Sequence, residues 1–195
     1  KEVYPVTPKV AYAFASIPSR IYLENKNWNA AAAVALYPTD FAWVKFPWQE
    51  SIIHFTRLLG AVHLNNNDLA IVELTKLKQL HNILEKQKDV YKSKQVATQI
   101  KTGEAWIHFK TGQKQQALHE MQLAAAMEDS TEKHPVTPGE VLPARELLGD
   151  MLMQMNKPDK AKKKNKANLK KHPNRFNGLY GAGLAAEKCK KKKKA

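Results

Sequence analysis

Apolar residues recur at steps of three and four along most of this chain, and short polar breaks interrupt the pattern at intervals. That spacing is typical of amphipathic helices, whereas the alternation of a strand is almost absent beyond Val3 to Val10. Breaks such as residues 65–68 and Thr111-Gly112 are only a few residues long, so the helices on either side are expected to be neighbours in space. The sequence therefore predicts an all-α fold of antiparallel helix pairs.

The positions of the breaks predict about four pairs and a final helix, arranged as a single α-solenoid. The pairs cover about residues 10–36, 50–86, 91–128 and 143–171, the final helix covers about 175–188, and a long loop covers 130–142. Gly112 stands where a helix would end in a left-handed cap. Pro143 suits the first turn of a helix, and Pro18 predicts a kink or a late start in the first one.

Two small residues of the C-terminal pair recur after 34 residues, Gly149 as Gly183 and Ala161 as Ala195. A helix-turn-helix period of this length is the pattern of tetratricopeptide (TPR) arrays, and the chain resembles that family. The resemblance rests on Leu148, Gly149, Ala161, Leu169, Pro173, Tyr180, Ala182 and Gly183. Looser copies occur at Leu59-Gly60 with Asp68, and at Gly112 with Ala117 and Ala124, so that nearly the whole chain is covered.

Three segments are similar to one particular group within the TPR family, namely the C-terminal half of large bacterial TPR proteins of uncharacterised function. These segments are residues 43–50, 127–139 and 142–150. The similarity implies that the chain is a fragment of a longer helical-repeat protein, with further repeats upstream. It also implies a non-catalytic scaffold for protein binding rather than an enzyme, without a cofactor.

In the TPR family the first helix of each pair lines a concave groove, and the resemblance places nine residues of this chain there. They are His54, Arg57, Trp106, Phe109, Lys110, Glu146, Asp150, Met153 and Tyr180. Such a mixed aromatic and charged groove suits an extended peptide or a partner helix. The alternative is that Trp106 and Phe109 simply pack against the neighbouring pair. Because Glu146 and Asp150 stand where some members carry Lys and Asn, a clamp for a peptide's terminal carboxylate is not expected.

The charge of the chain is concentrated at its C-terminal end. Residues 157–195 hold 15 of the 32 Lys and Arg residues but only two of the 18 acids, so this segment carries +13 and the rest +1. A block of like charge is most often a solvated end. The alternative function is an electrostatic anchor to nucleic acid or an acidic membrane, with nucleic acid the less favoured partner.

The basic segment also departs from the repeat pattern. Asn165 and Asn168 stand where the last pair needs apolar residues, and Lys190–Lys194 stand where a turn is expected. One hypothesis is that several of these lysines take the place of other residues, in which case the charge is not a property of the protein. The competing hypothesis is a real polybasic extension.

Motifs for chemistry are sparse. None of the seven histidines is paired at the i, i+4 spacing of a helical zinc site, and no nucleophile elbow or glycine-rich phosphate loop occurs. No metal site is predicted, and the weak candidates are Glu128, Asp129, Glu132 and His134. Without a run of about 18 apolar residues no transmembrane segment is expected, so the protein is predicted to be soluble. Its compartment stays open between the bacterial cytoplasm and, after removal of a signal peptide, the periplasm.

Overall fold

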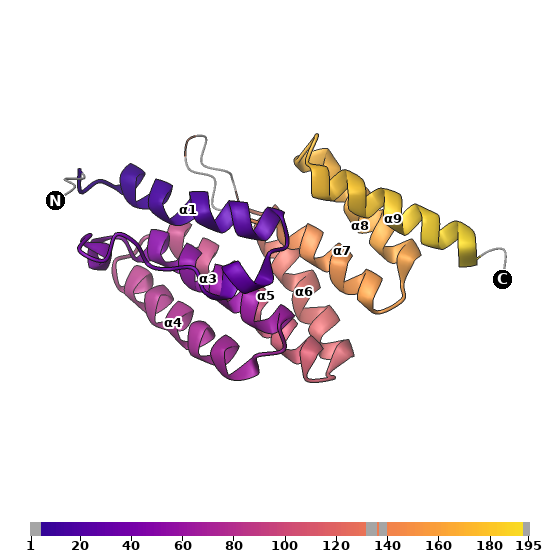
Figure 1. Ribbon diagram of the computed structural model, residues 1–195, viewed down its shortest axis with the longest axis horizontal. Coiled ribbons are helices and arrows are strands. Elements are labelled where there is room, and N and C mark those ends of the chain that lie inside the picture. The colour runs from indigo at the N-terminus through magenta and orange to yellow at the C-terminus, as the bar shows by residue number, and fades with distance from the viewer. Residues whose placement is uncertain (1–4, 132–135, 137–139, 193–195) are drawn as a thin grey trace.

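The computed structural model describes residues 5–131, 136 and 140–192 (Figure 1). In this part of the chain every regular element is helical, and no strand is present. The helices are α1 (Pro8–Glu24), α2 (Trp28–Ala32), η1 (Trp43–Lys45), α3 (Pro47–His63), α4 (Asn67–Lys86), α5 (Val90–Lys110), α6 (Lys114–Asp129), α7 (Ala144–Gln154), α8 (Pro158–Lys171) and α9 (Phe176–Lys192), with η1 a single 3₁₀ turn. None of them is long and apolar enough to cross a membrane.

Helices that follow each other in the sequence also pack against each other in space. The main pairs are α3 with α4, α5 with α6, and α7 with α8, while α9 packs on α8 and the short α2 packs on α3. The elements step along the molecule from the indigo α1 to the yellow α9 (Figure 1). The all-α solenoid of four helix pairs and a final helix, predicted from the sequence, is confirmed.

Local signals explain where the helices begin and end. Side-chain oxygens of Thr7, Asn27, Asn66 and Asp89 accept hydrogen bonds from backbone amides in the first turns of α1, α2, α4 and α5. Such caps satisfy amides that have no partner within the helix. After α5 the chain turns at Gly112 with a φ of 88°, as predicted for a left-handed cap.

The first pair differs from its predicted bounds. The helix α1 begins at Pro8 and continues through Pro18, so the late start expected there is wrong. The helix α2 ends at Ala32 rather than at Leu36. One cause is visible: the carbonyl of Val34, just beyond the end of α2, accepts a hydrogen bond from Arg57 Nε at 2.6 Å.

Two glycines allow the helices of the array to approach closely. A Cβ on Gly60 of α3 would overlap the backbone nitrogen of Ala32 in α2, and one on Gly149 of α7 would overlap the side chain of Asn165 in α8. At Gly183 of α9, in contrast, a Cβ would meet nothing within 4 Å. The glycines of α3 and α7 thus lie at helix contacts, whereas the equivalent surface of α9 is uncovered.

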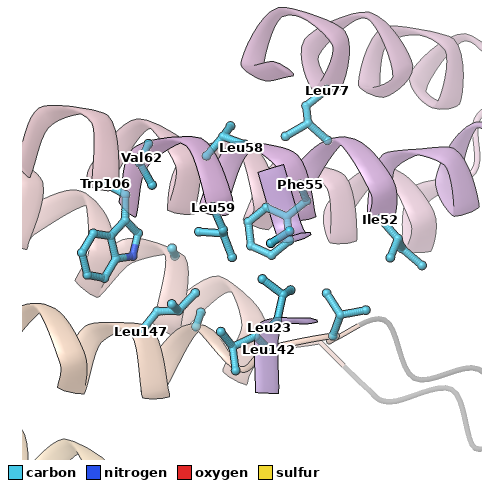
Figure 2. Packing of buried hydrophobic residues seen from close by; sticks show 14 of the residues in the cluster. Leu23, Ile52, Phe55, Leu58, Leu59, Val62, Leu77, Trp106, Leu142 and Leu147 are labelled. Atoms are coloured by element: carbon cyan, nitrogen blue, oxygen red, sulfur yellow. The ribbon is translucent and has the colours of Figure 1, made fainter. Parts of the chain in front are cut away.

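The two ends of the array are not independent, because α1 meets segments more than 100 residues away. Arg20 donates a hydrogen bond to the carbonyl of Glu140 at 2.9 Å, and Lys26, just after α1, pairs with Asp150 of α7 at 2.7 Å. Figure 2 shows Leu23 of α1 and Leu142 pointing toward Phe55 and Leu59 of α3. The first pair therefore closes over α3 and fills the space in front of it.

Replacing Gly60 by alanine tests the close contact between α3 and α2. We expect Gly60→Ala to lower the free energy of unfolding by about 2 kcal/mol, because the added methyl group would meet backbone atoms that cannot move aside. Urea denaturation followed by circular dichroism measures the change.

Gly183→Ala is the matched control, since it places the same methyl group in open space. We expect it to raise the free energy of unfolding by up to about 1 kcal/mol through better helix propensity. Equal effects of the two substitutions would contradict the assigned contact.

Candidate functional site

The nine residues predicted to line a concave groove fall into three classes of exposure. His54, Trp106, Phe109 and Glu146 are buried, Arg57, Lys110, Asp150 and Met153 are half-buried, and Tyr180 is exposed. Where an open groove was expected, the side of α3 and α5 is covered by α1 and by residues 140–144. Only the α9 end of the predicted surface is open.

Trp106 takes part in an aromatic stack that joins three helix pairs. The imidazole of His63 lies 3.8 Å from the ring of Trp28 and 4.5 Å from that of Trp106, measured between ring centroids. Phe109 meets Trp106 edge to face. Trp106 thus packs against the neighbouring pair, the alternative left open by the sequence, and Phe109 is buried beside it in the core. Substituting Trp106, which has no exposed surface, would test folding rather than binding.

His54 and Arg57 belong to a buried ionic cluster between α3 and α4. His54 Nδ1 is 2.5 Å from a carboxylate oxygen of Glu73, and its Nε2 is 3.5 Å from Glu50. Arg57 is 3.7 Å from the other oxygen of Glu73. Burial by itself lowers the pKa of His54, but the hydrogen bonds to Glu50 and Glu73 outweigh it and raise the pKa above its usual value. The cluster fixes α4 on α3.

Glu146 lies in a second polar cluster, which joins α1, α7, α8 and α9. Its carboxylate accepts hydrogen bonds from Asn168 at 2.9 Å and from Arg175 Nε at 2.7 Å. Arg175 also reaches Glu24 of α1 at 2.6 Å, and Asn177 donates to the same carboxylate at 2.9 Å. Burial alone would lower the pKa of Arg175, but the two glutamates raise it, so the guanidinium is firmly charged.

The sequence did not single out Arg175, Glu24 or Asn177. These three residues carry no motif, and only the return of α1 to the fourth pair brings them together. Asn165 and Asn168 are buried, at positions where the repeat pattern predicts apolar residues. Asn168 is accommodated by its hydrogen bond to Glu146. Met153 packs against the hydrophobic core, and Lys110 is close enough to His63 to influence its charge.

The weak metal candidates have structural partners where they are described. The carboxylate of Glu128 accepts the backbone amide of Ala144 at 3.0 Å and so caps the start of α7. Asp129 pairs with Arg145 and, at 2.9 Å, with Lys171. Glu132 and His134 lie outside the described residues. Among the residues that are described, no group of three His, Cys, Asp or Glu side chains could hold a metal ion.

An open cavity of about 780 Å³ between α4 and α5 contains a serine and a histidine in contact. Ser93 Oγ is 3.0 Å from His81 Nε2, and Glu85 is 3.8 Å from the same nitrogen. In a catalytic triad the acid holds the opposite ring nitrogen and so sets the tautomer that accepts the serine proton. This arrangement lacks that geometry and does not build an activated nucleophile.

Uncovered apolar side chains gather at the two ends of the array. On α9, Phe176 is 75% exposed, Leu179 55%, Tyr180 58% and Leu184 37%, and the rings of Phe176 and Tyr180 are stacked. Together with Gly183 these residues form what we term the α9 face. On α1, Ile17 and Ile21 are exposed one turn apart, and Ile17 lines an apolar cavity of about 410 Å³ together with the exposed Tyr37. We term these three residues the α1 face.

The stack around His63 predicts a pH dependence of stability. Burial lowers the pKa of His63 from 6.5 to about 4, and the nearby Lys110 and Lys26 act in the same direction. Between these values the unfolded chain binds a proton that the folded chain does not bind, so this residue removes about 3 kcal/mol of stability as the pH falls from 6.5 to 4. Urea titrations at several pH values measure the loss.

His63→Phe keeps an aromatic ring between the tryptophans but does not titrate. We expect its stability to fall by about 3 kcal/mol less than that of the wild type over the same pH range, because the carboxylates that also protonate there are common to both proteins. If the stability of His63→Phe and that of the wild type fell equally as the pH is lowered, His63 would not be held neutral in the folded chain.

Comparisons with known proteins leave the family open. A scan against family models finds no match, and searches of curated proteins and of solved structures find no significant similarity. The resemblance to TPR arrays therefore stays a prediction from the sequence.

Proposed function

We propose that this chain is a non-catalytic scaffold that binds a protein or peptide partner through the ends of its helical array. The observation that carries the proposal is the α9 face, a row of exposed apolar side chains that follow one another at helical steps. Exposed apolar surface that is contiguous rather than scattered is typical of interaction sites. Tyr180, the exposed member of the predicted groove, lies in this row.

The packing of the rest of the molecule supports this choice of surface. The side of α3 and α5 that would form a groove is filled by Leu23, Leu142 and Leu147, each at most 4% exposed. A partner there would have to displace a packed core, whereas a partner on the α9 face would gain apolar burial at once. The α1 face offers a second surface of the same kind.

A second candidate function is an electrostatic anchor, and the surface of α8 favours it. The exposed lysines Lys160, Lys163, Lys166 and Lys170 follow one another at steps of three and four, so they lie on one side of the helix. The opposite side carries the buried Ala161 and Asn165. A stripe of this kind attracts phosphate groups of an acidic membrane or of nucleic acid.

Selection of peptide ligands tests the scaffold against the anchor. A random peptide library displayed on phage is selected on the folded chain, and synthetic copies of the enriched peptides are titrated by calorimetry. We expect helix-forming peptides that bind with micromolar affinity and keep most of it in about 0.3 M salt, because apolar contacts are not screened.

Two end-face variants and one control locate the binding. The double variants Leu179→Ser with Tyr180→Ser and Ile17→Ser with Ile21→Ser remove apolar groups from the α9 and α1 faces. The control, Ile71→Ser with Val72→Ser, removes similarly exposed groups from α4. Loss of peptide binding in an end-face variant alone supports the scaffold. Failure to select any peptide, together with salt-sensitive binding to anionic vesicles, would establish the anchor instead.

A further inference from the structure

The α9 face has an internal counterpart that shows how such a surface is covered. With the 34-residue period, Gly183 of α9 corresponds to Gly149 of α7, and Tyr180 corresponds to Glu146. In α7 both positions meet α8, since Gly149 lies against Asn165, and Glu146 accepts a hydrogen bond from Asn168. In α9, a Cβ on Gly183 would meet nothing within 4 Å, and Tyr180 is exposed.

We propose that the α9 face binds an acidic amphipathic helix of a partner protein, lying along α9 as α8 lies along α7. This inference deepens the proposed function, on which it rests, by naming the surface and the chemistry of the partner. The bound helix would place a small residue opposite Gly183 and apolar residues against Leu179 and Tyr180.

The shape of the surface fits a helix rather than an extended strand. Phe176, Tyr180, Gly183 and Leu184 follow one another at helical steps and make one continuous stripe along α9. Within the chain, α8 approaches α9 in the same way on its other side. There, Gly178 and Gly181 lie against Leu169 and Asn165. Gly183 is the third such glycine and has no helix on it.

Charge decides between the possible occupants. Residues 157–192 carry 13 basic and two acidic residues, and the exposed Lys188 and Lys190 lie near the end of the α9 face, next to one of the two acids, Glu187. A second copy of this chain would bring two such surfaces together and meet repulsion. An acidic helix would meet complementary charge instead. The chain uses this pairing itself, since Lys171 of α8 holds Asp129 of α6 at 2.9 Å.

Two designed peptides of about 20 residues test the inference. Both follow the register of α8, with alanine opposite Gly183 and leucine at the other inward positions. One peptide carries glutamate and the other lysine at every outward position. Binding of each fluorescently labelled peptide to the full chain is measured by anisotropy. We expect the glutamate peptide to bind at least about tenfold more tightly than the lysine peptide.

Gly183→Leu is the sharpest variant, because the added side chain has room in the free chain and blocks the approach of a helix. We expect it to unfold no more easily than the wild type and to weaken the glutamate peptide at least about tenfold. The double variant Leu179→Ser with Tyr180→Ser should have the same effect on binding. The α4 control variant, Ile71→Ser with Val72→Ser, should leave it unchanged.

Several results would overturn the inference. Absence of binding by the glutamate peptide, equal binding of both peptides, or unchanged binding to Gly183→Leu would each do so. Concentration-dependent dimers in sedimentation velocity that Gly183→Leu abolishes would show that a second copy is the occupant. If peptides from the library bind only the α1 face, the inference fails but the scaffold function stands. If no peptide binds at all, both fail.

Discussion

The return of α1 to the fourth helix pair is the contact on which the rest of the structure depends. Arg175, which immediately precedes α9, holds Glu24 of the first pair and Glu146 of α7 at the same time. Leu23 lies one residue before Glu24 and is completely buried with Leu142 and Leu147 in the same core. Ionic contacts thus join residues 151 positions apart in the sequence, and an apolar core shared by distant segments lies beside them. In an open array, each pair would touch only its neighbours.

This closure explains why the predicted inner side is buried whereas one side of α9 is exposed. The helices α1 and α5 both pack on α3, whose residues belong to the common core, so α3 is enclosed on nearly every side. The helix α9 comes after the closing contact and lies outside it. Within the described residues its inner side therefore stays uncovered, so Phe176, Leu179 and Tyr180 are exposed rather than part of a core. Arg175 and Asn177 meanwhile fix the start of α9 on α1, which holds this surface in a defined position.

The helices could be predicted because their signals are local. Apolar periodicity, capping residues and short polar breaks act within a few residues, and the pairs came out close to their observed bounds. The end of α2 was missed because it depends on Arg57, 23 residues further along, which binds the carbonyl of Val34. The glycine and alanine pattern marked helix contacts, and Gly60 and Gly149 do lie at such contacts. Asn165 and Asn168 stand where the register calls for apolar residues, and both positions are buried.

The arrangement of the site could not be predicted in the same way, because the curvature of the array is a global property. A groove position and a core position have the same local pattern, so His54 and Glu146 could be assigned to the inner side but not recognised as buried, and for Trp106 both interpretations stayed open. Arg175 was missed for a related reason, since its two partners come from α1 and α7. Tyr180 has the same register as Glu146 but is exposed, because in the described part of the chain no helix lies on that side of α9 as α8 lies on α7.

Native-state hydrogen exchange on Leu23→Ala tests the closure most directly. Removing this buried side chain leaves a cavity and is expected to cost about 3 kcal/mol. If α1 closes the array, amides in α7 should lose protection together with those in α1, because the two helices share one core. Loss of protection confined to α1 and α2, with α7 unchanged, would show that the first pair is an independent end and would contradict the closure.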